Sequence, residues 1–64
     1  MSNKKIFEEI LSLFGKEPAL LFCKMEGKKC RMEMEDLKER NIDPEDLEYH
    51  AEWWENKYNQ LLNS

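Results

Sequence analysis

The strongest local signal in this sequence is a helix start at residues 42–47, which read Ile-Asp-Pro-Glu-Asp-Leu. Asp43 suits the N-cap, where its carboxylate can accept a bond from a free backbone N–H, and Pro44 suits the first helical position. Two acidic residues follow, and negative charge is favourable at the positive end of a helix dipole. The pattern predicts a helix that continues to about Leu62. Its predicted core face consists of Leu47, Ala51, Trp54, Tyr58, Leu61 and Leu62, with His50 at the edge.

An earlier helix is predicted over residues 3–14, because apolar residues repeat there at helical spacing. Ser2 or Asn3 can cap its start. Gly15 can adopt the positive φ that ends many helices, and Pro18 follows where a helix is not expected to continue. The predicted apolar face consists of Ile6, Phe7, Ile10, Leu11, Leu13 and Phe14.

Between these helices the apolar residues alternate with polar ones, which is typical of a strand. Residues 30–34 place two methionines and a cysteine on one face and two charged residues on the other. We therefore predict a β-hairpin with strands Ala19–Met25 and Lys29–Met34 and a turn at residues 26–28, where Gly27 supplies conformational freedom. A short helical turn, Asp36–Arg40, and a left-handed stop at Asn41 would complete the connection.

These elements predict one α+β domain over residues 1–64, in the order helix, strand, strand, short helix, helix. A two-stranded antiparallel sheet is marginal in water, so both long helices are expected to cover it. A chain of this length buries only about 60% of the surface that its unfolded form exposes, and a partner subunit is one common remedy. We accordingly expect a homodimer, joined through Tyr49 and Trp53 or through Leu20 and Phe22 on the outer side of the hairpin.

No run of apolar residues approaches the roughly 18 that a membrane span requires, and the start lacks the unbroken apolar core of a signal peptide. The expected location is the cytoplasm, where cysteines remain reduced. The high share of lysine over arginine suits an AT-rich bacterial or phage genome.

Cys23 and Cys30 would lie on the same face of adjacent strands. A disulfide or half of a zinc site is conceivable there, but six residues separate the two cysteines and His50 is the sole histidine. We interpret both as buried core thiols, and we expect neither a metal nor another cofactor.

No nucleophile, base and orienting group can be assembled from the serines and His50, and no phosphate-binding loop is present. We therefore predict no catalytic residue, and the protein is not expected to be an enzyme.

The charge is divided unevenly along the chain. Residues 1–31 carry seven basic and four acidic groups, a net +3, whereas residues 32–64 carry three basic and ten acidic groups, a net −7. Such asymmetry indicates either a binding surface for a charged partner or two halves that pack against each other.

The last helix carries the candidate binding surface. Tyr49 and Trp53 lie four residues apart and away from the predicted core face, and exposed Tyr and Trp are frequent binding hot spots. The neighbouring polar residues are Asn56 and Gln60, with an acidic stripe of Glu45, Glu48, Glu52 and Glu55. The leading interpretation is a small protein-binding module of the inhibitor, adaptor or regulatory kind. The alternative is structural, with Trp53 covering the sheet edge or Tyr49 shielding the hairpin.

A second cluster lies at the tip of the predicted hairpin and consists of Lys24, Lys28, Lys29 and Arg31. These side chains could contact phosphates, which makes a nucleic-acid-associated regulator the first alternative. Aromatic residues for base stacking do not interleave with them, and the last helix would repel nucleic acid. A further alternative is that the acidic stripe imitates nucleic-acid phosphates and blocks an enzyme that binds them.

Overall fold

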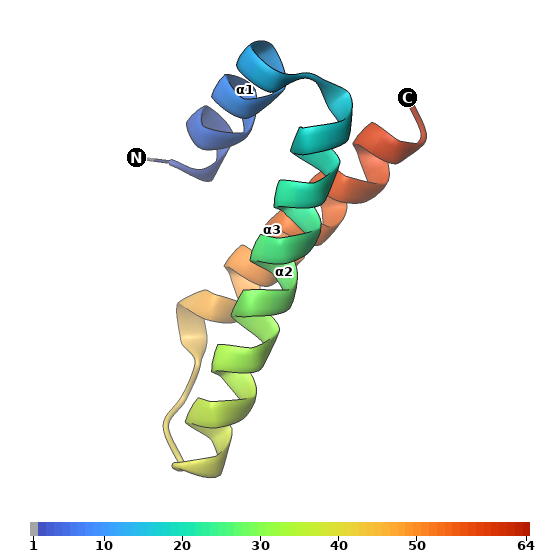
Figure 1. Cartoon of the computed structure of the whole chain (residues 1–64). Helices are drawn as coiled ribbons and strands as arrows, with labels where there is room; N and C mark the ends of the chain where they lie inside the picture. Colours follow the sequence, from blue (N-terminus) through green and yellow to red (C-terminus); the bar gives the residue numbers. More distant parts are fainter. Residues whose placement is uncertain (1) are drawn as a thin grey trace.

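The computed structural model describes residues 2–64, and these fold into three helices (Figure 1). They are α1 (Asn3–Phe14), α2 (Lys16–Glu39) and α3 (Glu45–Leu62), and the described residues include no strand. The expected α+β class is therefore wrong, and this part of the chain is all-helical. None of the three helices is long and apolar enough to cross a membrane.

The predicted hairpin and the short helical turn after it both belong to α2, a helix of 24 residues. Residues 16–39 contain no Val, Ile or Thr, the β-branched residues that favour strands, and are rich in Lys, Glu, Leu and Met, which favour helices. The alternation that suggested a strand does not match burial, because Met32 is exposed while Cys30 and Met34 are buried. The outer hairpin face expected around Leu20 and Phe22 accordingly does not exist.

The spacing that does match burial in α2 is the alternation of three and four residues that brings one stripe of a helix to face a neighbour. This inner stripe consists of Leu20, Cys23, Gly27, Cys30, Met34 and Leu37. It packs against α3, whose predicted core face has the same spacing from Leu47 to Leu61. Ala51 and Trp54 are the buried residues of α3, so the predicted phase of this helix is confirmed.

Helices α2 and α3 cross near their middles (Figure 1), and small residues occupy the crossing point. A Cβ added at Gly27 would lie 3.3 Å from Glu55 Cγ and 3.9 Å from both the Ala51 carbonyl oxygen and Trp54 Cβ. Gly27 therefore lies in a closely packed position where a side chain larger than that of alanine would press on α3, and it is not a turn residue.

The bounds predicted for the first helix are confirmed, and Ser2 caps it by accepting a bond from the Lys5 N–H at 3.2 Å. Gly15 alone connects α1 to α2, with φ +94° and ψ −176°, a conformation that is essentially restricted to glycine. The expectation that no helix continues through Pro18 is wrong. Pro18 lies in the first turn of α2, where backbone N–H groups have no helical partner and proline is tolerated.

Asn41 terminates α2 in the expected left-handed conformation, with φ 60°. The Ile42 N–H donates to the Leu37 carbonyl at 2.8 Å, and the Asn41 N–H donates to the Lys38 carbonyl at 3.0 Å. This pair of bonds is a Schellman motif, which satisfies carbonyls at a helix end. The next helix starts one residue later than expected, with Pro44 rather than Asp43 at the N-cap and no side-chain capping bond.

Helix α1 lies beside the start of α2 and also reaches α3 through side-chain contacts. The rings of Phe7 and Trp53 meet edge to face, 6.2 Å apart, and Asn3 Nδ2 lies 2.7 Å from His50 Nδ1. The molecule remains slender, with a radius of gyration of 12.7 Å. A compact domain of this length is expected at about 11 Å. The buried apolar residues are Ala19, Cys23, Cys30, Met34, Ala51 and Trp54.

Substitutions at Gly27 test the crossing. Gly27→Ala should change the free energy of unfolding little, since the gain of about 1 kcal/mol in helix propensity offsets a small displacement of Glu55. Gly27→Leu should lower it by about 1–3 kcal/mol, because the larger side chain must push α3 away. Urea unfolding followed by circular dichroism measures both. Equal stability of the Ala and Leu variants would contradict the close approach.

Candidate functional site

The outward side of α3 is the candidate site, and most of the residues predicted for it lie there. Tyr49 is 63% exposed and is the large hydrophobic residue on this surface. We call the surface the α3 outer face, and it consists of the exposed residues Glu45, Glu48, Tyr49, Glu52, Asn56 and Gln60. Two other predicted members, Trp53 and Glu55, are placed differently.

Trp53 is half-buried between α1 and α3. Besides Phe7, it contacts the ring of Trp54 at 4.9 Å, and the Lys57 ammonium lies 5.4 Å from its ring centroid. The same ammonium lies 5.7 Å from the Phe7 centroid, so one cation faces two aromatic rings of this cluster. Trp53 thus attaches α1 to α3, and only part of its ring is accessible.

Glu55 faces α2 and binds Arg31 in a two-bond fork. Arg31 Nε donates to Glu55 Oε2 at 3.0 Å, and Arg31 Nη2 donates to Glu55 Oε1 at 2.8 Å. These bonds hold the pKa of Glu55 below its ordinary value and raise that of Arg31. Nearly half of each side chain remains exposed, so the pair adds little stability and mainly fixes how the helices face each other. The pair joins the basic first half of the chain to the acidic second half, as the packing interpretation of the charge asymmetry expects.

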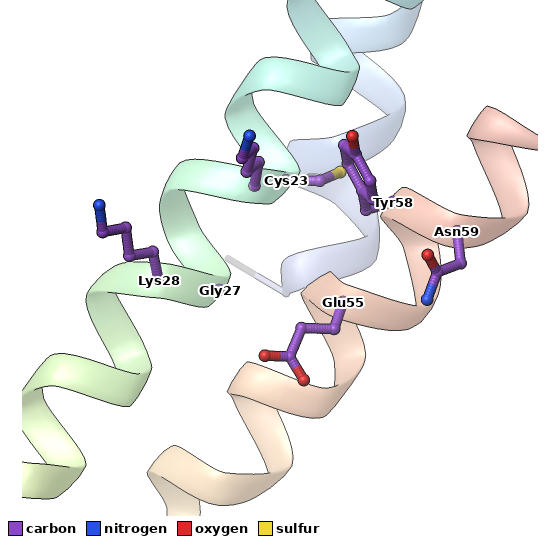
Figure 2. A pocket seen from close by; sticks show the side chains of 7 residues that line it. Cys23, Gly27, Lys28, Glu55, Tyr58 and Asn59 are labelled. Carbon is purple, nitrogen blue, oxygen red and sulfur yellow. The ribbon is translucent and has the colours of Figure 1, made fainter.

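A groove of about 390 Å³ lies beside this pair, between α2 and α3. Figure 2 shows Cys23 pointing across the groove toward Tyr58, while Lys28 points away from α3. The residues that line it are Cys23, Lys24, Gly27, Lys28, Glu55, Tyr58 and Asn59. Its floor is the packed inner stripe, and its one carboxylate is already bound by Arg31.

The two cysteines are buried and free, as the interpretation of core thiols requires. They lie seven residues apart on one helix rather than on adjacent strands, which separates their Cα atoms by about 10 Å and prevents an internal disulfide. Burial raises the pKa of both thiols, which suppresses the reactive thiolate. No group of three or more metal-binding side chains occurs in the part of the chain that the structure describes.

Helix α2 keeps most of the predicted basic cluster on one side. Lys24, Lys28 and Arg31 follow a spacing of four and three residues along the helix, whereas Lys29 points to another side. The three lysines are exposed, and Arg31 is bound by Glu55. Two exposed methionines, Met25 and Met32, accompany these lysines, and a shallow hollow of about 360 Å³ lies among them. The hairpin interpretation placed Met32 on the same face as Cys30 and thus missed this apolar surface. The signal that indicates it is the helical spacing of residues 21, 25, 28 and 32.

No protein-family model, curated protein or solved structure matches this chain.

The Arg31–Glu55 fork predicts an acid-dependent contribution to stability. Because the pKa of Glu55 is lowered on folding, the contribution is complete above the ordinary glutamate pKa and is lost as the pH falls through the lowered value. The difference in unfolding free energy between the wild type and Glu55→Gln should therefore be largest near pH 7 and shrink toward about pH 3. Urea titrations at several pH values measure it. The control is Glu8→Gln, which removes an exposed carboxylate of α1 without an ion pair, and an identical pH dependence for the two variants would contradict the role of the fork.

The adjacent tryptophans should respond differently to truncation. Trp54 is 3% exposed, and Trp54→Ala should cost about 3–5 kcal/mol, enough to unfold much of the protein. Trp53→Ala should leave α2 and α3 packed but reduce the protection of α1 amides in hydrogen exchange. Phe7→Ala should reproduce this local effect, since it removes the other ring of the contact. Unchanged α1 protection in both variants would show that these rings do not hold α1.

Proposed function

We propose that this protein is a non-enzymatic protein-binding module whose contact surface is the α3 outer face. The observation that carries the proposal is the exposure of Tyr49 among carboxylates that form no ion pair within residues 2–64. Glu45 and Glu52 lie one helical turn before and after it, and the ion pairs of residues 2–64 are Arg31–Glu55 and Arg40–Asp36. A tyrosine ring offers a large contact area with little loss of conformational entropy.

The arrangement also suggests the chemistry of the partner. A complementary surface would carry lysine or arginine side chains around a hollow that accepts the tyrosine ring. Because the face lies on a single regular helix, its side chains are presented by a rigid element, which suits an inhibitor, adaptor or regulatory subunit. An enzyme that binds nucleic acid would present such a basic surface, so mimicry of phosphates is one form of the same proposal.

The nucleic-acid-associated alternative has weaker support. It would depend on Lys24, Lys28 and Lys29, because Arg31 is occupied by Glu55. Acidic residues follow these lysines along α2 from Glu33 onward, and such charges oppose the approach of a phosphate backbone.

A comparison of matched variants tests the proposal. Tyr49→Ala combined with Glu48→Gln and Glu52→Gln should abolish capture of a partner that the wild type retains from cells that produce the protein. The control, Glu8→Gln with Glu9→Gln, removes two exposed carboxylates from α1 and should retain that partner. Loss of Tyr49 alone should weaken binding by about 2 kcal/mol if it is a hot spot.

Two results would contradict the proposal. One is equal capture by the wild type and the α3 variant, whose folding is checked by circular dichroism. The other is a mobility shift with mixed DNA and RNA at low salt that is lost on Lys28→Glu with Lys29→Glu, since that result would assign the function to α2.

A further inference from the structure

Helix α2 carries a second apolar stripe on the side opposite α3. Leu21, Met25 and Met32 are 60%, 60% and 61% exposed, respectively. Together with Lys28 they follow the alternation of four, three and four residues that aligns side chains along one face of a helix. We call these four residues the α2 outer stripe. In Figure 1, α3 passes behind α2 and α1 lies beside its start, so no helix of residues 2–64 covers the stripe.

A helix with apolar stripes on two opposite faces is suited to a position between two neighbours. The inner stripe of α2 has its neighbour in α3, and the outer stripe has none within the described chain. The small core of the monomer also favours a second neighbour for α2. Most of its buried side chains are small, and the molecule is more extended than a compact domain of its length.

The order of charges along α2 indicates which neighbour fits. The first part of the outer surface is basic, with Lys24, Lys28 and Lys29, and the last part is acidic, with Glu33, Glu35, Asp36 and Glu39. An antiparallel copy of the same helix would place each basic part against an acidic part. When a two-fold axis passes near the midpoint of α2, each half of the helix faces the other half in the second copy, and opposite charge on the two halves makes that contact favourable. An unrelated partner requires no such symmetry.

We propose that this protein forms a symmetric dimer through antiparallel packing of the α2 outer stripes. In this arrangement Met25 lies opposite Met32 of the second copy. Lys24 and Glu35 are eleven residues apart, about three helical turns, and therefore flank the stripe on the same side. Each Lys24 consequently lies near Glu35 of the other copy. The interface leaves both α3 outer faces free, so it is independent of the proposed function.

Lys28 lies near the centre of this interface and close to its own counterpart. The two ammonium groups repel each other, and their long side chains must extend toward water. A lysine within an apolar stripe weakens a helix pair but also specifies its register. The dimer is therefore expected to be reversible, and Lys28→Leu should tighten it.

The test uses charge reversal and sedimentation equilibrium at low salt, from about 1 µM to about 1 mM. The wild type should show a reversible monomer–dimer equilibrium. Lys24→Glu and Glu35→Lys should each weaken it by about tenfold, because each places like charges together at two equivalent positions. An equimolar mixture of the two variants should form a heterodimer of wild-type strength, and the double variant should regain self-association.

Two further variants complete the test. Met25→Ala with Met32→Ala should weaken the dimer more than either charge reversal, whereas Tyr49→Ala should leave it unchanged. Circular dichroism checks that each variant remains folded. A monomeric wild type throughout the concentration range would overturn the proposal. So would a dimer that is insensitive to the α2 variants, or a mixture of the charge variants that fails to restore association.

Discussion

The close approach of α2 and α3 at Gly27 is the contact on which the rest of this structure depends. Glycine costs about 1 kcal/mol relative to alanine within a helix, so its presence there needs a compensating contact. A Cβ at Gly27 would be tight only against Glu55 Cγ and would already touch the Ala51 carbonyl and Trp54 Cβ, so a side chain larger than that of alanine has no room there. Trp54 is buried at this contact and meets the ring of Phe22 at 5.3 Å, which gives the small core its one large aromatic group. A side chain larger than that of alanine at position 27 would push α3 away from α2 and would thereby expose Trp54 and weaken its contact with Phe22.

The attachment of α1 follows from the same crossing. Consecutive residues of a helix point about 100° apart, so the α3 phase that directs Trp54 toward α2 also directs Trp53 toward α1. His50 lies one turn before Trp54 on the α1 side and meets Asn3 there. The single connecting residue, Gly15, confines α1 to this side of the helix pair. Two adjacent tryptophans of α3 therefore contact both other helices, Trp54 on the α2 side and Trp53 on the α1 side.

The sequence was sufficient to predict α1 and α3 but not α2, and the reason lies in the side chains of the inner stripe. In α1 and α3 the repeating residues are large and strongly apolar, so the helical period is clear. In α2 the positions that face α3 include Cys23, Gly27 and Cys30, whose small side chains give a weak hydrophobic signal. The exposed Met32 falls between two buried residues and produced a false alternation of period two. The absence of β-branched residues from 16–39 was the available evidence against a strand.

The candidate site was predictable to the extent that it depends on one helix. The exposure of Tyr49 follows from the phase of α3 alone and was correctly expected. The positions of Trp53 and Glu55 depend on where α1 and α2 pack, and a wrong assignment of α2 as a hairpin removed that information. Arg31 was assigned to a basic cluster with Lys24 and Lys28, and helical spacing does place it on their side of α2, but the hairpin assignment hid the Glu55 carboxylate that binds its guanidinium.

The arrangement of charge connects the two proposed surfaces. Arg31 and Glu55 neutralise each other between the helices, whereas the α3 outer face and the α2 outer stripe belong to different helices and share no residue. Binding at one surface would therefore not occupy the other. A dimer joined through α2 would also present two α3 outer faces, and two linked contacts bind a repeated or symmetric partner far more strongly than either contact alone. In that arrangement the second stripe of α2 would increase both the stability of a thin core and the avidity of a small contact surface.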